Sequence, residues 1–486
     1  MKKAICTLLI SLITASCFPQ KIPARFDPKK LHWCKPNGIS DSVLCGLCPV
    51  AENRQTNKSR IINLNVVVIP AVHSDSLLAP IFDIDGGPGA ADTKSVWFYA
   101  DPENPYHQHH DIVLVDVRGT GQSNPLNCYS LQYKASLDEQ FDDMYPPEKV
   151  RQCYDELSKI ADLKQYTTTN IVKDLEDVRK WLGYDKIELF SLSYGTRVAL
   201  VYMKLFPASL RACVLWSPIP TYGKMPMYHA VTAQKTLERL FAACKNDPDC
   251  NATFPDLEKE FYTLMNAWFG RSMIVKHIDS INIVHEIEIS WDGFETGLRQ
   301  LMYSPAGLRQ IPYIIHQCYM NNFEPVLSYY PQGSDTSKFI AEGLYLCVTC
   351  AEDVPFIKTA KKKGLDSLTQ HTFMGSYRID QQRAACKNWV QGEIPRDFLD
   401  TIHSEIPTLI FSGSYDPVTP TWMAAEIATH LPHSTLIMIP EMSHIVDGLT
   451  NIDCFDNVAL NFLDDPLHQV NYDCVRTMTP PPFKLK

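Results

Sequence analysis

A serine stands where a short apolar run meets a helical pattern. Residues 187–190 are apolar, residues 190–195 read Phe-Ser-Leu-Ser-Tyr-Gly, and an apolar-periodic segment follows over 196–206. A strand, sharp turn and helix in this order can hold a serine hydroxyl clear of the backbone, beside the free N–H groups that open the helix. Ser193 is therefore a candidate nucleophile. Alone the pattern is weak, because Ser191 replaces the usual first glycine and capping serines give the same pattern.

An acid and a base follow Ser193 along the chain. Asp416 comes just after an apolar strand pattern at 407–412, and His444 comes just after another at 435–439. A serine nucleophile needs a histidine to take its proton and a carboxylate to orient that histidine. Parallel strands end at one edge of a sheet, so the three residues are expected there together. Alone, Asp416 would be interpreted as a capping residue and His444 as a surface-loop residue, but the ordered set predicts a catalytic triad.

A glycine-rich turn, Gly86-Gly87-Pro88-Gly89, follows a predicted strand at 80–85. The tetrahedral intermediate of acyl transfer needs two N–H donors for its oxyanion. We expect these from Tyr194, the residue after the nucleophile, and from Gly87. Glycine suits this place because it allows close backbone approach and positive φ. A phosphate-binding loop is disfavoured, since Pro88 lacks an N–H and no Lys-Ser/Thr follows.

Strand and helix patterns alternate around these residues. The predicted strands are 61–69, paired with 47–51, then 80–85, 111–117, 187–190, 212–216, 407–412 and 435–439. The predicted helices of this part are 171–182, with Asn170 as its cap and Gly183 at its end, 196–206, 421–431 and 446–463. This alternation predicts a mostly parallel sheet covered by helices on both faces.

The pattern changes between residues 220 and 400. Apolar residues recur there at helical spacing over 233–243 and 261–269, and β-alternation is scarce. We predict an inserted, mainly helical lid over 220–400. The sheet domain would then comprise residues 41–219 and 401–474, preceded by an irregular lead-in at 18–40 and followed by a tail at 475–486.

The first residues read as an export signal. Lys2-Lys3 precedes an apolar run over 4–13, which is shorter than the roughly 18 residues that a membrane span needs. We therefore predict a signal peptide at 1–17 and no transmembrane span. Cys17 follows two small residues, so a lipoprotein signal with a lipid anchor on Cys17 stays open. The protein would be periplasmic, an outer-membrane lipoprotein or secreted.

Composition and cysteines agree with an exported globular protein. The 486 residues carry a net charge of -10 without a basic stripe, which argues against a nucleic-acid partner. Outside the signal region 14 of the 16 cysteines remain, which favours disulfides in an oxidising compartment. The close-spaced candidates are Cys128 with Cys153, Cys244 with Cys250, Cys350 with Cys386, and Cys454 with Cys474. Cys213, within an apolar strand, reads as a free core thiol.

Two weaker patterns could indicate redox or metal chemistry. Cys45 and Cys48 have the spacing of a redox pair, and with Cys347 and Cys350 could form a zinc site. Strand material follows Cys48 instead of a helix, and export favours disulfides, so both alternatives are disfavoured. The histidines at 107, 109 and 110 lack regular partners and read as surface residues. We predict no metal and no cofactor.

Together these motifs resemble a known family, the exported bacterial prolyl- and tripeptidyl-aminopeptidases. The motifs that carry the resemblance are Asp85-Gly86-Gly87-Pro88-Gly89, Asp116-Val117-Arg118-Gly119-Thr120-Gly121-Gln122-Ser123, Ser193-Tyr194-Gly195-Thr196-Arg197, Asp416-Pro417-Val418-Thr419-Pro420, His444 and Cys347-Val348-Thr349-Cys350-Ala351-Glu352-Asp353. The resemblance implies an α/β-hydrolase-fold serine peptidase that releases amino acids or short peptides from free N-termini. It also implies an acidic lid group that holds the α-amine, and Glu352 and Asp353 match that motif. A solvated loop end is the alternative for these two residues.

Two residues depart from the family pattern. Ser191 adds a Cβ where the elbow usually has glycine, and Asp85 stands where relatives that release proline often have histidine. Asp116 and Arg118 read as scaffold residues that pin a turn. A carboxylesterase or lipase on the same fold is the alternative function, and a catalytically silent binding protein is a second one.

Overall fold

The computed structural model describes residues 21–36, 39, 41–74, 77–132, 136–279, 281–329, 340–357 and 368–486. The predicted signal peptide at 1–17, including Cys17, lies outside the described residues. In these ranges no helix combines the length and apolar character needed to cross a membrane.

One large sheet forms the centre of the part that the structure describes. It has nine strands in the order β1-β2-β3-β5-β4-β6-β7-β10-β11. Their bounds are β1 Leu31–Cys34, β2 Val43–Ala51, β3 Ile61–Ile69, β4 Ile81–Ile84, β5 Ile112–Val115, β6 Ile187–Leu192, β7 Leu210–Trp216, β10 Thr408–Gly413 and β11 Ser434–Ile439. The β1/β2, β2/β3 and β3/β5 pairs are antiparallel. The remaining neighbours in this sheet, β5/β4, β4/β6, β6/β7, β7/β10 and β10/β11, are parallel. The predicted α/β-hydrolase fold with a mostly parallel sheet is confirmed.

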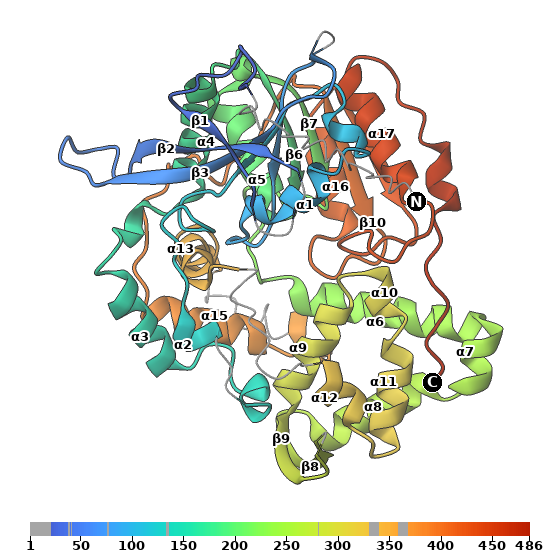
Figure 1. Ribbon diagram of the computed structural model, residues 1–486. Helices are drawn as coiled ribbons and strands as arrows, with labels where there is room; N and C mark the ends of the chain where they lie inside the picture. The colour runs from blue at the N-terminus through green and yellow to red at the C-terminus, as the bar shows by residue number, and fades with distance from the viewer. Residues whose placement is uncertain are drawn as a thin grey trace, which may run out of the picture.

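Helices cover both faces of this sheet (Figure 1). Alternate residues of each strand point to opposite faces, so Phe82 and Ile81 lie in different apolar clusters. One face packs against α4 (Thr168–Leu182), α5 (Tyr194–Leu205) and α16 (Thr421–Thr429). The other packs against α1 (Val96–Tyr99) and α17 (Asp453–Asp464). Burial on both faces explains why the parallel strands read as continuous apolar runs.

Two predicted helix boundaries are wrong. Helix α4 begins at Thr168, so Asn170 lies inside it, whereas Gly183 ends it at φ +86° as expected. The closing helix α17 begins at Asp453, seven residues after the expected start. Val446 and Leu449 mimicked helical periodicity because they are buried against the sheet as loop residues.

The lead-in is not irregular throughout. Residues Leu31–Cys34 form β1, which pairs antiparallel with β2 at the edge of the sheet. Cys34 also forms a disulfide with Cys45. The run Leu-His-Trp-Cys is only four residues long, too short for its sequence to carry a clear strand signal. Arg25 ion-pairs with buried Asp111 at 2.7 Å and ties the segment down further.

A second, largely helical part lies on one side of the sheet (Figure 1). Its elements between residues 220 and 400 are α6 His229–Asn246, α7 Pro248–Thr253, α8 Leu257–Trp268, β8 Ser272–Ile278, β9 Val284–Ser290, α9 Trp291–Leu301, α10 Pro305–Leu308, α11 Ile311–Tyr319, α12 Glu324–Tyr329, α13 Glu342–Glu352 and α15 Tyr377–Lys387. Helices α2 (Tyr129–Gln132) and α3 (Pro147–Leu157) lie on the same side, beside α15. The division at 220 and 400 stays a proposal.

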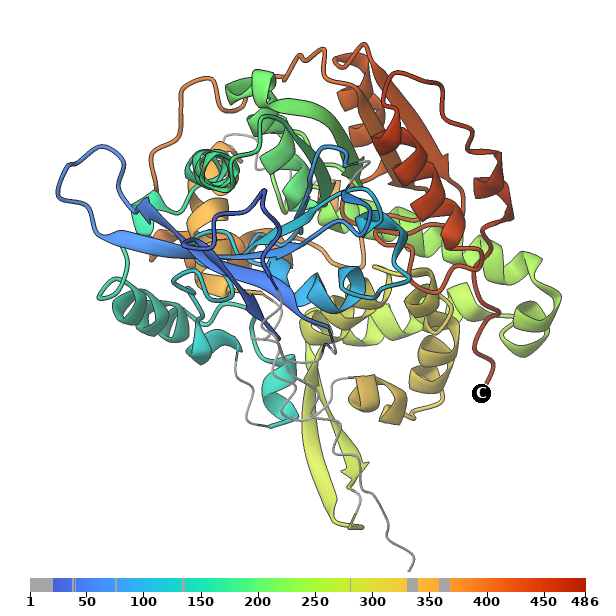
Figure 2. The same ribbon diagram turned by 45° about the horizontal axis from the view of Figure 1, so that its top comes forward.

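The antiparallel hairpin β8–β9 is the element of this part that the sequence did not reveal. It projects from the helices, as Figure 2 shows. Val275, Ile287 and Ile289 are buried on its inner face, while Ile274 and Ile278 are exposed. These exposed isoleucines obscured the alternation of apolar and polar residues that would have indicated strands.

In the described ranges ten cysteines form five disulfides. The four expected pairs are all present, and Cys34–Cys45 is the fifth. Because Cys45 and Cys350 are bonded to other partners, the redox and zinc interpretations are wrong. Cys213 is a buried free thiol, as expected. Among the residues described, no group of three potential metal ligands comes together.

Two of the three clustered histidines are not surface residues. His107 and His110 are buried, and their ring nitrogens contact the carbonyl oxygens of Tyr99 and Ala79. The tail is not free either. Phe483 is buried under the Arg309 guanidinium, 4.0 Å from the ring centre, and the Lys484 N–H donates to the Arg309 carbonyl. The end of the chain thus lies against the helical part (Figure 1).

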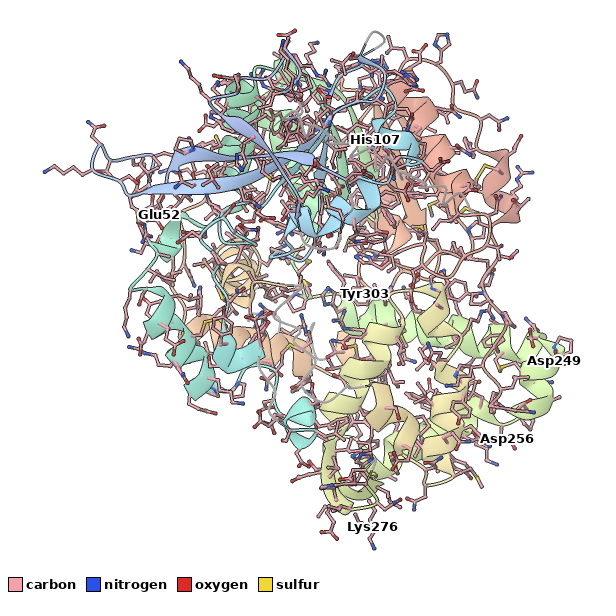
Figure 3. The ribbon with its side chains drawn as sticks, in the orientation of Figure 1. Glu52, His107, Asp249, Asp256, Lys276 and Tyr303 are labelled. Atoms are coloured by element: carbon pink, nitrogen blue, oxygen red, sulfur yellow. A yellow bond between two sulfur atoms is a disulfide. The ribbon has the colours of Figure 1, made fainter. Side chains whose placement is uncertain are left out.

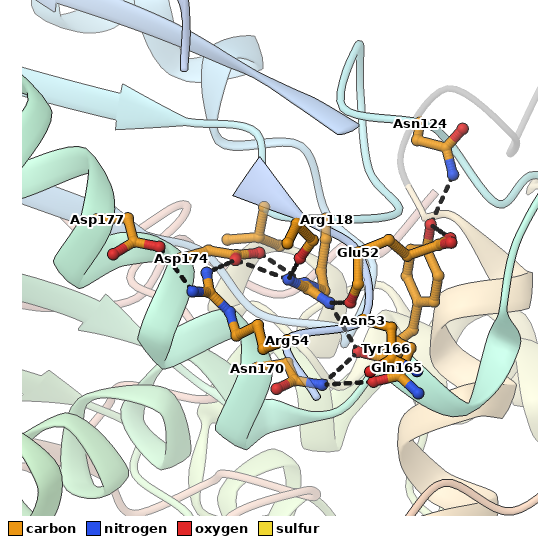
Figure 4. A network of polar contacts seen from close by, with 12 residues as sticks. Glu52, Asn53, Arg54, Arg118, Asn124, Gln165, Tyr166, Asn170, Asp174 and Asp177 are labelled. Carbon is orange, nitrogen blue, oxygen red and sulfur yellow. Dashed lines mark hydrogen bonds and ion pairs between the residues drawn. The ribbon is translucent and has the colours of Figure 1, made fainter. Parts of the chain in front are cut away.

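A buried network supports the turn after β5 (Figure 4). Arg118, fully buried, donates to both carboxylate oxygens of Asp174 at 2.6 and 2.7 Å and to the Glu52 and Gln165 carbonyl oxygens. Asp116 accepts hydrogen bonds from the Gln122 N–H at 2.9 Å and from the Asn65 side chain at 3.0 Å. Both are scaffold residues, as the sequence predicted.

Arg118→Met is expected to lower the free energy of unfolding by about 3 kcal/mol, because it leaves the buried Asp174 carboxylate with less compensation. Urea denaturation would measure this. Arg151→Met is the matched control: its exposed pair with Asp155 should contribute less than about 1 kcal/mol. Equal losses in the two variants would contradict a structural role for Arg118.

Candidate active site

Ser193 occupies a sharp turn between β6 and α5. Its backbone has φ 55° and ψ −120°, a conformation that non-glycine residues rarely adopt. The Ser193 N–H donates to the Trp216 carbonyl at 2.9 Å, and its own carbonyl accepts from the Thr196 N–H at 3.0 Å. The side chain is half-buried, so the hydroxyl sits at the end of β6 with access to solvent.

Two glycines make room for this turn. A Cβ on Gly195 would lie 2.2 Å from the Ile84 carbonyl oxygen, and one on Gly86 would lie 2.8 Å from the Ser193 Cβ. Both positions therefore require glycine. Ser191 has no such conflict: it is buried in β6 and its hydroxyl donates to the Val214 carbonyl at 2.8 Å. The missing first glycine of the motif is thus replaced by a serine bonded to the neighbouring strand.

Asp416 and His444 form a buried pair at the same edge of the sheet. His444 Nδ1 lies 2.8 Å from Asp416 Oδ2, and both residues are 4% exposed. The other carboxylate oxygen accepts the N–H groups of Val418 and Thr419 at 2.7 and 2.9 Å. The Thr419 hydroxyl donates to Asp416 Oδ2 at 2.7 Å and lies 3.3 Å from His444 Nδ1. Thr419 is a supporting residue that the sequence did not single out.

The loop that carries His444 is fixed from two sides. The Ser217 hydroxyl, at the end of β7, donates to the His444 carbonyl at 2.7 Å. From the helical part, the Met302 carbonyl accepts from the Ser443 hydroxyl, and the Tyr303 carbonyl accepts from the Ile445 N–H at 3.0 Å. The histidine is thus held between the sheet and the segment after α9.

The two expected oxyanion donors flank Ser193. Tyr194 is the first residue of α5, where N–H groups have no intrahelical acceptor. Gly87 has φ +112° and follows Gly86, the glycine that lies against Ser193. The assignment of Tyr194 and Gly87 to the oxyanion hole stays a proposal.

Glu352 and Asp353, at the end of α13, are fully buried and are not a solvated loop end. Asp353 binds Arg197, four residues after Ser193, with both oxygens at 2.9 and 3.2 Å. Glu352 accepts the Thr168 N–H and hydroxyl at 2.6 Å each, and the Tyr194 hydroxyl donates to the Thr168 hydroxyl at 2.7 Å. Two carboxylates thus face one guanidinium beside the elbow.

Further polar residues of the helical part lie near His444. The Tyr303 ring packs edge-on against the His444 ring with centroids 5.1 Å apart. Tyr303 lies where the helical part meets the sheet (Figure 3). Arg299 donates to the Tyr303 hydroxyl at 3.0 Å, and Glu295, His229 and Arg378 lie close enough to Arg299 or Tyr303 for electrostatic interaction. The sequence did not reveal these residues; the spacing of Glu295, Arg299 and Tyr303 by four residues was the available signal.

The comparisons with known proteins agree with this geometry. A family model of the α/β-hydrolase fold matches residues 80–263, and a model described as TAP-like protein matches residues 371–474. Together the two matches span more than half of the chain. The chain belongs to the TAP-like α/β hydrolases.

Several curated relatives of this TAP-like hydrolase are named as peptidases, and YuaR of Escherichia coli, 22% identical over 474 residues, is named as a putative hydrolase. Serine protease Hip1 of Mycobacterium tuberculosis is 22% identical over 434 residues, 82% of this chain and 81% of the relative. Tripeptidyl aminopeptidase of Streptomyces lividans is 31% identical over 121 residues, 23% of this chain and 22% of the relative. A proline iminopeptidase of Aspergillus aculeatus is 29% identical over 163 residues, 31% of this chain and 32% of the relative.

The ionisation of Glu352 should make the stability of this TAP-like hydrolase depend on pH. Burial raises the pKa of Glu352 from 4.5 to about 7, against the lowering effect of Arg197 and the Thr168 hydrogen bonds. A raised pKa means that the fold favours the protonated form. Its stabilising contribution is therefore present at low pH and lost as the pH rises through about 7.

Glu352→Gln removes this titration. Between pH 5 and pH 8 the wild type should lose about 1–3 kcal/mol of stability that the variant keeps. The melting temperature of the variant should therefore rise relative to that of the wild type over this range. Thermal unfolding of both proteins across that range measures the difference. Parallel curves would show that Glu352 does not titrate in this window.

Proposed function

We propose that the protein is an exported serine aminopeptidase that releases amino acids or short peptides from free peptide N-termini. The observation that carries the proposal is the buried Asp416–His444 pair at the sheet edge where Ser193 holds φ 55°. The names of the curated relatives support peptides as the substrate class.

In this proposal Ser193 attacks the scissile carbonyl carbon while His444 Nε2 takes the hydroxyl proton. Asp416 orients the ring through Nδ1 and stabilises the imidazolium. The Tyr194 and Gly87 N–H groups bind the oxyanion of the tetrahedral intermediate. The protonated His444 gives its proton to the leaving amine, and water then hydrolyses the acyl-enzyme with His444 again as base. The mechanism needs no metal and no cofactor.

The charge beside the elbow supports preference for a free N-terminus. Glu352 and Asp353 together carry up to two negative charges, and Arg197 compensates one. A substrate ammonium group near Tyr194 would be attracted by the remaining charge and would favour ionised Glu352. The five disulfides of the described ranges support export. Lipidation of Cys17 belongs to the same proposal as an open alternative.

A carboxylesterase or lipase would use the same three residues, because a triad does not choose between esters and amides. Turnover of nitrophenyl esters without turnover of aminoacyl or peptidyl anilides would favour that function. A silent binding protein would not react with a fluorophosphonate probe.

Ser193→Ala should lower kcat on peptidyl anilides by about 10⁴–10⁶-fold and abolish fluorophosphonate labelling. Ser191→Ala is the matched control two residues away. Its hydroxyl donates to the Val214 carbonyl of a neighbouring strand, so labelling should persist. Near-wild-type turnover by Ser193→Ala would reject the assignment of the nucleophile.

Glu352→Gln should raise KM for anilides with a free α-amine by about tenfold and leave KM for nitrophenyl esters within about twofold, since only the former carry an ammonium group. Asp380→Asn, which removes an exposed charge from α15, serves as the control. A panel of N-terminally free and N-blocked mono-, di- and tripeptidyl anilides measures both effects. Equal changes in KM for amines and esters would argue against amine recognition by Glu352.

A further inference from the structure

Two guanidinium groups near His444 have no counter-charge in contact within the part of the chain that the structure describes. Arg299, on α9, donates to the Tyr303 hydroxyl at 3.0 Å, and Arg378, on α15, donates to the Tyr345 hydroxyl at 3.0 Å and to Met144 Sδ. Among the described residues, neither has a carboxylate within ion-pair distance. The Nε–H of each is buried without an acceptor.

The groups around them do not supply the missing charge. Glu295, four residues before Arg299, is fully buried, and neither of its oxygens has a hydrogen-bond partner. Burial raises the pKa of Glu295 well above its ordinary value, which favours the neutral acid, a hydrogen-bond donor. His229 is buried with both ring nitrogens unpartnered, and burial lowers its pKa, which favours the neutral ring. Glu342 accepts the Tyr145 hydroxyl at 2.5 Å and does not reach Arg378.

Such an arrangement is costly for folding alone. A buried cation without a paired anion loses hydration that nothing replaces, and each unsatisfied buried polar group adds to the cost. Four side chains with unused hydrogen-bonding capacity lie in this one region: Arg299, Arg378, Glu295 and His229. An anionic ligand bound beside the two guanidinium groups would accept from N–H donors that have no partner in the described structure.

The location of the two arginines beside His444 indicates which part of the substrate they would contact. Tyr303 packs on His444, and the Arg299 guanidinium lies 5.3 Å from the centre of the Tyr303 ring. His444 also lies close enough to His229 to influence its ionisation. Because the histidine of a serine peptidase protonates the leaving amine, the leaving part of the substrate lies on the His444 side.

We propose that Arg299 and Arg378 form a carboxylate-binding subsite for the leaving part of the substrate. The inference rests on the proposed peptidase function and adds a substrate class to it: peptides whose released part bears a carboxylate close to the scissile bond. Guanidinium groups suit this ligand because their planar N–H donors match the two oxygens of a carboxylate. The carboxylate is either the free C-terminus of a short peptide or an acidic side chain.

The experiment compares four peptide substrates that share one acyl part, namely the acyl part that the enzyme releases best in the anilide panel. The leaving parts are glycine with a free C-terminus, glycinamide, glutamyl amide and glutaminyl amide. We expect kcat/KM for at least one carboxylate-bearing substrate to exceed that of its neutral counterpart by about tenfold or more. Preference for the glycine leaving part would show that the subsite binds the C-terminal carboxylate. Preference for the glutamyl amide leaving part would show that it binds an acidic side chain.

Arg378→Met should lower kcat/KM for the preferred carboxylate substrate by about 10–100-fold and leave the neutral substrates within about threefold. Arg299→Met should have the same selective effect, and Arg378→Lys, which keeps the charge, should retain part of the preference. Lys387→Met is the matched control, because it removes an exposed positive charge from the same helix. Turnover of a neutral anilide shows that each variant is folded.

Three results would overturn the subsite. The wild type could hydrolyse carboxylate-bearing and neutral substrates equally well, or its preference could survive in both arginine-to-methionine variants. In each of these cases fluorophosphonate labelling and anilide turnover would persist, so the proposed peptidase function would stand. If the wild type were neither labelled by the fluorophosphonate probe nor able to hydrolyse anilides, the proposed function would be rejected, and the subsite with it.

Discussion

The close approach of three backbone segments at Ser193 is the constraint on which the site depends. The turn after β4, the end of β6 and the start of α5 meet so tightly that neither Gly86 nor Gly195 could carry a Cβ. This contact holds Ser193 at positive φ and brings the glycine-rich turn beside it. The surrounding structure must compensate the strain of that conformation, and the Trp216 and Thr196 hydrogen bonds to the Ser193 backbone do so locally.

The helical part of the molecule contributes to the geometry of the site as well as covering it. Met302 and Tyr303 hold the loop around His444, and Asp353 binds Arg197 within α5. The sheet edge therefore depends on contacts from α9 and α13 on two sides. The Glu352 carboxylate accepts the first N–H of α4 and the Thr168 hydroxyl. The Thr168 hydroxyl in turn is hydrogen-bonded to the Tyr194 hydroxyl, so Glu352 is linked to the residue after Ser193. An acidic side chain is favoured at a helix N-terminus, so its burial has a structural basis apart from any role in binding.

The sequence revealed the sheet well because its parallel strands are buried on both faces. Strand β3 has the predicted bounds, and β10 and β11 begin within one residue of them. The sequence also pointed to Asp416 and His444, because each of them follows such a strand. The edge strand β1 and the hairpin β8–β9 escaped because they are short or exposed and follow no clear alternation. Thr419, Tyr303 and the arginine cluster escaped for a different reason: their roles depend on contacts between segments far apart in the sequence, such as Tyr303 with His444 and Thr419 with Ser217.

The distribution of charge around the site bears on how a substrate is oriented. Near the elbow two carboxylates face one guanidinium, whereas near Tyr303 two guanidiniums lie around a carboxyl whose neutral form burial favours. The Tyr345 hydroxyl, on the same helix as Glu352, accepts a hydrogen bond from Arg378 at 3.0 Å. A peptide zwitterion has the complementary polarity, with its ammonium group and its carboxylate at opposite ends. In a poorly hydrated site such fields are weakly screened, so a substrate bound in the reverse direction would place like charges together at both ends. The buried charges of the site would thus favour one direction of binding along Ser193 and His444.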